Sequence, residues 1–189
     1  MAEHRRRLFI GIELDAAARA RCSAVSDALS ATGFAARYEA ADKLHATLAF
    51  LGNVERARYD SIAATHSEVA ARCTPFALQF DKAGAFPNER RPRVVYVGAR
   101  EQGAAFRSLA TAVQSAYAEF GFSFKEDAVA HVTIARVKEP SRPLPLLEVV
   151  PFGLEVRTIT LFESIFDAKA NTSRYEIAQR APLSFEVSS

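Results

Sequence analysis

A short motif occurs twice in the chain and constrains its fold more than any other feature. Residues His45-Ala46-Thr47-Leu48-Ala49 and His131-Val132-Thr133-Ile134-Ala135 both read His-x-Thr-[Leu/Ile]-Ala, within apolar runs of strand composition. Side chains alternate along a strand, so each copy is expected to place its histidine, threonine and last alanine on one face. Residues 46, 48 and 50, and in the second copy 132 and 134, are expected to pack a core. With four histidines in the chain, chance would produce such a pair on the order of once in a thousand sequences.

The remaining pattern predicts two similar halves, each with a helix-containing unit that leads to one motif strand. Strands are predicted at 6–14, 34–38, 44–51, 76–86, 94–98, 129–136, 154–166 and 173–181, and helices at 15–30, 55–72 and 104–120. Asp15 is the expected cap of the first helix, and Gly52 with Asn53 is expected to turn the chain. We therefore predict two lobes, each an antiparallel or mixed sheet with helices outside.

Composition limits the kind of protein this can be. At 189 residues and 49% hydrophobic content, the chain can bury a core as one compact unit or two fused lobes. A net charge of +2 is too small for a general nucleic-acid binder, so any basic site must be local. The sequence contains no transmembrane run, and the apolar segment 8–12 is too short for a signal peptide. These features predict a cytoplasmic protein that does not act at a membrane.

Three further side chains are expected to be structural. Cys22 and Cys73 lie in segments predicted as helical, without metal-ligand spacing, and are expected to be buried thiols rather than a disulfide. His66 lies on the second predicted helix, where a solvent-facing or edge position is expected rather than a ligand role.

The paired motifs, 86 residues apart (131 minus 45), resemble those of the 2H phosphoesterase superfamily, in particular the RNA 2',3'-cyclic phosphodiesterases, also called 2'-5' RNA ligases. Further similar segments are 7–12, 50–52, 85–87, 91–98, 135–136 and 161–164. The resemblance implies a bilobal α+β fold with pseudo-twofold symmetry, in which both motif strands face one central cleft. Residues 1–189 would then form a single domain made of two fused lobes.

Two histidines fit the chemistry of opening a cyclic phosphodiester. Attacking water must lose a proton and the departing sugar oxygen must gain one. Because imidazole has an ordinary pKa near 6.5, His45 and His131 can serve as acid and base, in either assignment, with an optimum around pH 6 to 8. Thr47 and Thr133 are candidate donors to the phosphate oxygens, the alternative being ordinary strand threonines. This mechanism needs no metal and no cofactor.

Other contacts follow less directly from the pattern. Strict alternation places Arg136 on the face away from His131, whereas similar proteins place an arginine here against the phosphate, which would require a strand end, twist or bulge. The basic loop at 90–93 is either a solvated hairpin tip or a contact for RNA phosphates. Candidate RNA or base contacts are Phe9, Phe50, Arg90, Arg91 and Arg93.

The leading hypothesis is hydrolysis of RNA 2',3'-cyclic phosphate ends. By resemblance the product would carry a 2'-phosphate, and the reverse reaction would join RNA ends through a 2'-5' bond. The expected partner is an RNA end, such as that of a tRNA, or a cyclic nucleotide, bound by a monomer. Alternatives are a phosphodiesterase for ADP-ribose cyclic phosphate or 2'-5' oligoadenylate, and a non-catalytic RNA- or nucleotide-binding module. A histidine-based metal protein would need more ligands than the motifs supply.

Overall fold

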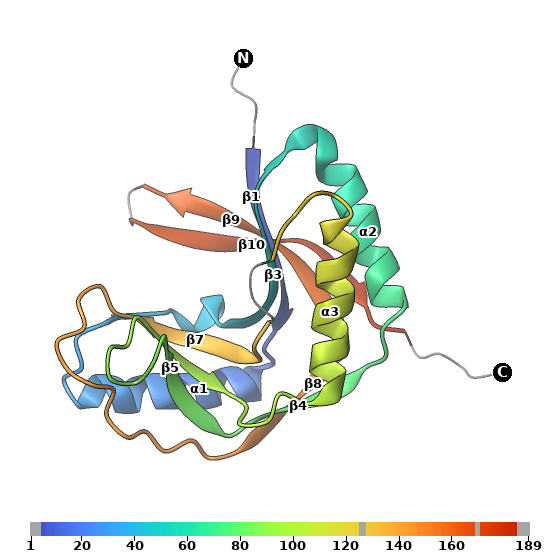
Figure 1. Cartoon of the computed structure of the whole chain (residues 1–189). Coiled ribbons are helices and arrows are strands. Elements are labelled where there is room, and N and C mark those ends of the chain that lie inside the picture. Colours follow the sequence, from blue (N-terminus) through green and yellow to red (C-terminus); the bar gives the residue numbers. More distant parts are fainter. Residues whose placement is uncertain (1–4, 125–127, 169–170, 185–189) are drawn as a thin grey trace.

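The computed structural model describes residues 5–124, 128–168 and 171–184, which form an antiparallel sheet with helices outside it (Figure 1). The strands are β1 (Arg5–Glu13), β2 (Arg37–Tyr38), β3 (His45–Glu55), β4 (Phe76–Phe80), β5 (Lys82–Phe86), β6 (Val94–Gly98), β7 (His131–Arg136), β8 (Phe152–Val156), β9 (Thr158–Asp167) and β10 (Thr172–Pro182). The α-helices are α1 (Ala16–Ala31), α2 (Tyr59–Ala71) and α3 (Ala104–Ala118). None of the helices in these residues is long and apolar enough to cross a membrane.

The sheet consists of two halves that meet at the two motif strands. Its order is β10-β9-β1-β3-β7-β6-β5, with β2 also pairing with β7, and every pairing is antiparallel. A single residue pair, Ala46 with Val132, joins β3 to β7 and so connects the halves. Strands β4 and β8 form a separate two-stranded sheet. The α+β class with two antiparallel halves is thus confirmed, and the halves share one continuous sheet.

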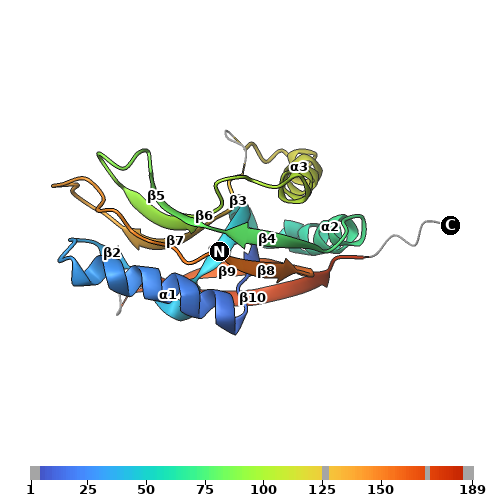
Figure 2. The same ribbon diagram turned by 90° about the horizontal axis from the view of Figure 1, so that it is seen from below.

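The helices connect the halves reciprocally. Helix α1 precedes the first motif strand but packs against β7 of the second, whereas α3 precedes the second motif strand and packs against β3 of the first. Helices α2 and α3 lie side by side, away from α1 (Figure 2). Buried apolar side chains of the sheet and the helices form one continuous hydrophobic core. Each motif strand is therefore packed by the helix that precedes the other motif strand.

Local chemistry explains the start and end of the first helix. The Asp15 side chain accepts a hydrogen bond from the Ala18 N–H at 2.7 Å, as the sequence predicted for a helix cap. Gly33 follows the helix with a φ of 68°, a conformation that glycine adopts without steric cost. The helix therefore ends just before β2 and the first motif.

Three predicted element boundaries were wrong. Gly52 and Asn53 do not turn the chain, because β3 stays paired with β1 as far as Glu55 opposite Arg5. The predicted strand at 76–86 is two strands that belong to different sheets, and the chain changes sheet at Asp81. The predicted strand at 154–166 likewise divides into β8 and β9.

His66 is a core residue rather than a solvent-facing one. Its side chain is fully buried, and its Nε2–H donates to the carbonyl of Ile159 at 3.1 Å. Burial without a charged partner lowers its pKa to about 4. Cys22 is buried, Cys73 is half-buried, and both are free thiols.

Candidate active site

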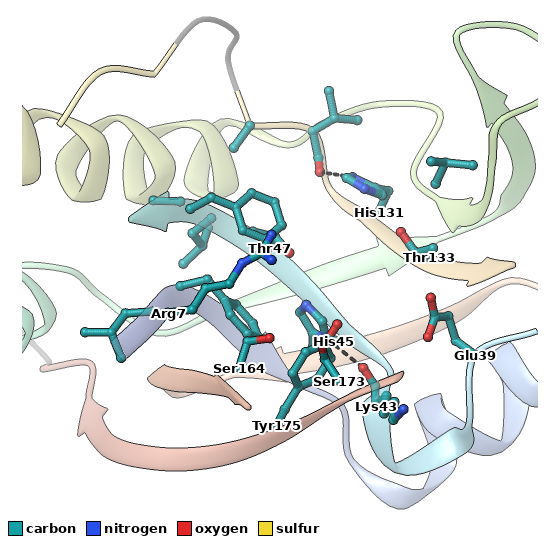
Figure 3. Close-up of a pocket in the computed structure, with 18 of the residues that line it drawn as sticks. Arg7, Glu39, Lys43, His45, Thr47, His131, Thr133, Ser164, Ser173 and Tyr175 are labelled. Carbon is teal, nitrogen blue, oxygen red and sulfur yellow. Dashed lines mark hydrogen bonds between the residues drawn. The ribbon is translucent and has the colours of Figure 1, made fainter. Parts of the chain in front are cut away.

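A cleft of about 800 Å³ lies along the junction of the two halves (Figure 3). It contains both motif histidines, His45 and His131, and both motif threonines, Thr47 and Thr133. The same cleft is lined by further residues that the motifs did not indicate, among them Arg7, Arg37, Glu39, Lys43, Gln114, Ser164, Ser173 and Tyr175. The structure thus brings together the four motif side chains that the sequence predicted to act together.

The two imidazoles are anchored in the same way. The Nδ1–H of His45 donates to the carbonyl of Lys43, and that of His131 to the carbonyl of Val129, each at 2.7 Å and each two residues upstream. A carbonyl can only accept, so the proton on each ring lies on Nδ1 when the ring is neutral. Each Nε2 is then left as the atom that can accept or donate a proton in the cleft. Because both rings present Nε2 to the cleft, one histidine can act as the base while the other acts as the acid.

Aromatic rings surround each imidazole and remove water from it. His45 contacts Phe9, Phe162 and Tyr175, with ring centroids 4.8 to 5.6 Å apart. His131 contacts Phe86 and Tyr96 at 5.1 and 5.5 Å. Burial is the main cause that lowers the pKa of both histidines below the ordinary 6.5.

Gly11 on β1 makes the close packing around His45 possible. A Cβ added at this residue would lie 2.7 Å from the backbone oxygen of Ala46 and 3.3 Å from the Phe162 ring. A side chain there would push β1 away from the first motif strand. The glycine thus lets β1 and Phe162 approach His45.

A β-bulge in each motif strand corrects the predicted face assignments. Along β3, Thr47 pairs with Gly11 and Ala49 with Ile10, so Leu48 is an extra residue without a partner in β1. Along β7, Thr133 pairs with Tyr96 and Ala135 with Val95, so Ile134 is the extra residue. An extra residue reverses the alternation beyond it. Ala49 and Ala135 are consequently buried in the core rather than sharing the histidine face.

The same bulges turn the next side chains, Phe50 and Arg136, into the cleft. Phe50, predicted to pack the core, is instead 63% exposed, and both residues line the cleft. Arg136 therefore reaches the site by the bulge that its predicted role required. Phe9 is only 3% exposed and its ring packs against His45. Of these two aromatic candidates, only Phe50 presents a face that a base could cover.

The basic loop does not contribute to the cleft. Arg90, Arg91 and Arg93 are absent from its lining. The backbone N–H groups of Arg90 and Arg91 donate to the Asn88 side chain, and the Arg93 guanidinium donates to the carbonyl of Lys138. The structure thus favours the hairpin-tip alternative for this segment.

The local positive charge that a basic site requires comes from other residues. Among the described lining residues, four carry positive charge, Arg7, Arg37, Lys43 and Arg136, and one is a carboxylate, Glu39, which pairs with Arg37 and Arg136. Alternation on β1 could have revealed Arg7, because it shares a face with Phe9 and Gly11. Glu39 and Lys43 carry no comparable sequence signal. No group of three or more His, Cys, Asp or Glu among the described residues is placed to hold a metal ion.

Anchored imidazoles, hydroxyls and cations in one cleft are the equipment of an acid–base enzyme that acts on a phosphate ester. Comparison with known proteins agrees. The family model described as LigT like Phosphoesterase matches residues 12–96 and 97–169. This chain therefore belongs to the LigT-like phosphoesterase family.

Relatives and solved structures extend this match over most of the chain. The chain is 34% identical over 170 residues to the RNA 2',3'-cyclic phosphodiesterase of Archaeoglobus fulgidus, covering 86% of this chain and 93% of that protein. It is 30% identical over 144 residues to the protein of the same name from Methanothermobacter thermautotrophicus, covering 76% and 78%. The crystal structure of E. coli LigT complexed with 3'-AMP is 29% identical, with a TM-score of 0.78 over 96% of this chain and all of that one.

Proposed function

We propose that this enzyme hydrolyses RNA 2',3'-cyclic phosphate ends to 2'-phosphate ends without a metal, with His45 and His131 as acid and base. The observation that carries the proposal is the matched anchoring of both Nδ1 atoms, 2.7 Å from carbonyl oxygens, in one cleft. The names of the relatives support the substrate class, since they are RNA 2',3'-cyclic phosphodiesterases.

The reaction proceeds by in-line displacement at phosphorus. One imidazole, neutral at Nε2, takes a proton from water as the new P–O bond forms. The other imidazole, protonated at Nε2, gives a proton to the 3' oxygen as the P–O3' bond breaks, which leaves the phosphate on the 2' oxygen. Thr47 and Thr133 donate hydrogen bonds to the non-bridging phosphate oxygens as negative charge develops on them. The Arg136 guanidinium donates further hydrogen bonds to the same oxygens.

The same displacement can run with a different nucleophile. With an RNA 5'-hydroxyl in place of water, the 5' oxygen bonds to phosphorus and the 3' oxygen leaves with a proton, which gives a 2'-5' phosphodiester. In the reverse direction the 3'-hydroxyl loses its proton and attacks phosphorus, and the protonated 5' oxygen leaves, which restores the cyclic phosphate. Phe50 serves as a stacking platform for the terminal base. The six side chains of the proposed site all line the cleft of one chain, so the enzyme can act as a monomer: His45, Thr47, Phe50, His131, Thr133 and Arg136. The two cysteines are free thiols, as expected for a protein of the reducing cytoplasm. RNA ends such as those of tRNA are the expected substrates there.

Product identity tests this proposal. The purified protein is given each of the four nucleoside 2',3'-cyclic phosphates, and the product isomer is identified by chromatography against 2'- and 3'-phosphate standards. We expect the 2'-phosphate alone. The 3'-phosphate as sole product would contradict the proposed direction of cleavage, and no hydrolysis of these substrates or of an oligoribonucleotide with the same end would contradict the function.

A further inference from the structure

Glu39 is an unexpected residue in a cleft proposed to bind a phosphate. It lies between β2 and the first motif, on the Thr133 side of the cleft (Figure 3). Its side chain is only 12% exposed, and its Oε1 accepts a hydrogen bond from the Nε of Arg136 at 2.9 Å. A carboxylate here repels a phosphate, so we expect Glu39 to favour substrate binding or catalysis in some other way that offsets this repulsion.

The backbone of Glu39 supports the bulge that brings Arg136 into the cleft. Its N–H donates to the carbonyl of Ile134 at 2.9 Å, and Ile134 is the bulge residue that has no partner in β6. The two preceding residues, Arg37 and Tyr38, pair with Arg136 and Ala135. One residue thus contacts both the irregular backbone of β7 and the side chain that this irregularity redirects.

The Arg136–Glu39 contact leaves the phosphate-binding groups of the guanidinium free. A guanidinium has five N–H donors, and the described contact uses only the one on Nε. The four N–H groups on the two Nη atoms remain to bind phosphate oxygens. A free arginine loses rotamer entropy when it is fixed, so a side chain held in advance binds phosphate at a lower free-energy cost.

We propose that Glu39 is a positioning residue of this site, whose N–H supports the bulge at Ile134 and whose carboxylate directs the Arg136 guanidinium toward the substrate phosphate. The inference rests on the proposed function for the identity of that phosphate. Glu39 acts through Arg136 and takes no part in the proton transfers.

The carboxylate has a second effect, on His45. Of the charged groups near this imidazole, Glu39 raises its pKa, whereas His131 and Arg136 lower it. The elements packed against His45 add Tyr175, whose own pKa is raised by burial so that it stays neutral, and Glu13, whose carboxylate is held by Arg180 and Thr160. Removing the charge of Glu39 is therefore expected to lower the pKa of His45 and leave His131 little changed.

A double-mutant cycle tests the link to Arg136. We expect Glu39→Ala to lower kcat/KM for a nucleoside 2',3'-cyclic phosphate by about tenfold to a hundredfold, since misplaced groups cost rates of this order. Glu39→Gln keeps an acceptor oxygen and should lose less. Compared at the pH optimum of each variant, which removes the effect on the His45 pKa, adding Glu39→Ala to Arg136→Ala should change kcat/KM less than about twofold, because neighbours that act together are not additive. Full additivity, or a rise in kcat/KM for Glu39→Ala, would overturn the proposal.

Two readouts separate this role from a purely structural one. In the pH profile, Glu39→Gln should move one limb to lower pH clearly more than the other, which would also show which limb His45 dominates. In a ¹⁵N-labelled protein, the Arg136 Nε–H signal, identified by its loss in Arg136→Lys, should be protected in the wild type and exchange fast in Glu39→Ala. This second readout does not depend on activity, so it tests Glu39 even if the proposed substrate is wrong.

The matched control is Glu155→Gln, which removes a carboxylate paired with Arg157 at 3.5 Å on β8, outside the cleft. We expect it to leave kcat/KM, both pH limbs and the Arg136 signal unchanged. The positioning role would be wrong if the pH limbs of Glu39→Gln match those of the wild type and the Arg136 Nε–H of the wild type exchanges fast with solvent.

Discussion

Phe50 and Arg136 occupy equivalent positions in the two halves of the cleft. Each lies three residues beyond its motif threonine, and each follows a bulge at the residue after that threonine. The histidines, threonines and bulges of the halves match, but this pair is chemically unlike. One half of the cleft presents the aromatic ring of Phe50, and the other presents the cation of Arg136 at the equivalent position. The two sides of the cleft therefore suit different groups, a base on the Phe50 side and charged phosphate oxygens on the Arg136 side.

Replacing Phe50 tests the aromatic side of this polarity. Stacking of a base on an aromatic side chain contributes about 1–3 kcal/mol, so Phe50→Ala should raise KM about fivefold to a hundredfold with kcat changed less. Phe50→Tyr should keep most of the affinity. The control is Phe166→Ala, which removes a similarly exposed ring on β9 that does not line the cleft. Equal kinetics for both alanine variants would contradict a stacking role.

Replacing Arg136 tests the charged side. A lysine cannot reproduce the fork of N–H donors that binds two phosphate oxygens while also bonding Glu39, so Arg136→Lys should lower kcat/KM by tenfold or more. Arg91→Ala removes a cation outside the cleft and should have no such effect. Steady-state kinetics on one cyclic nucleotide, with the fold checked by circular dichroism, measures both. Wild-type kinetics in Arg136→Lys and Arg136→Ala would remove this residue from the site.

The pH dependence of the rate follows from the buried histidines. The base must be neutral, which holds above its pKa, and the acid must be protonated, which holds below its pKa, so kcat/KM should be bell-shaped. Because burial lowers both pKa values from 6.5, the maximum should lie on the acidic side of 6.5. The limbs report macroscopic values of the pair. A flat profile between about pH 5 and 9 with chemistry rate-limiting would contradict a two-histidine mechanism.

His66 makes the stability of the protein depend on pH. Its pKa is about 4 in the folded state and 6.5 ordinarily, so between these values the unfolded chain binds more protons and stability falls as the pH falls. The loss from pH 7 to pH 4 is on the order of 3 kcal/mol, at about 1.36 kcal/mol per pH unit. Urea unfolding at several pH values should show a shallower decline in His66→Leu. Parallel curves for the two proteins would contradict this assignment.

Much of the site could be predicted because its parts recur in the sequence. The repeated His-x-Thr motif placed His45, Thr47, His131 and Thr133 on two strands, and the cleft contains all four. Side chains do not alternate regularly beyond the threonines, since a bulge depends on the partner strand and leaves no local signal in the sequence. Strict alternation therefore predicts the wrong face for Phe50.

Contacts between distant segments were equally beyond sequence reasoning. Glu39 meets Arg136 across 97 residues, and His66 became a core residue because α2 packs on β9 and β10. Neither outcome follows from local propensity or spacing. The first depends on the pairing of β2 with β7, and the second on the packing of α2 against the sheet.

The most direct test of the account is the rate at which wild-type protein, His45→Ala and His131→Ala hydrolyse a ribodinucleotide with a 2',3'-cyclic phosphate end in excess EDTA. We predict that the wild type stays active and forms only the 2'-phosphate. Each variant should turn over about a hundredfold to ten-thousandfold more slowly while binding 2'-AMP nearly as well, because each loses one proton transfer. More than about a third of wild-type activity in either variant would contradict the account. Wild-type activity that is lost on chelation and restored by one divalent ion would contradict it equally.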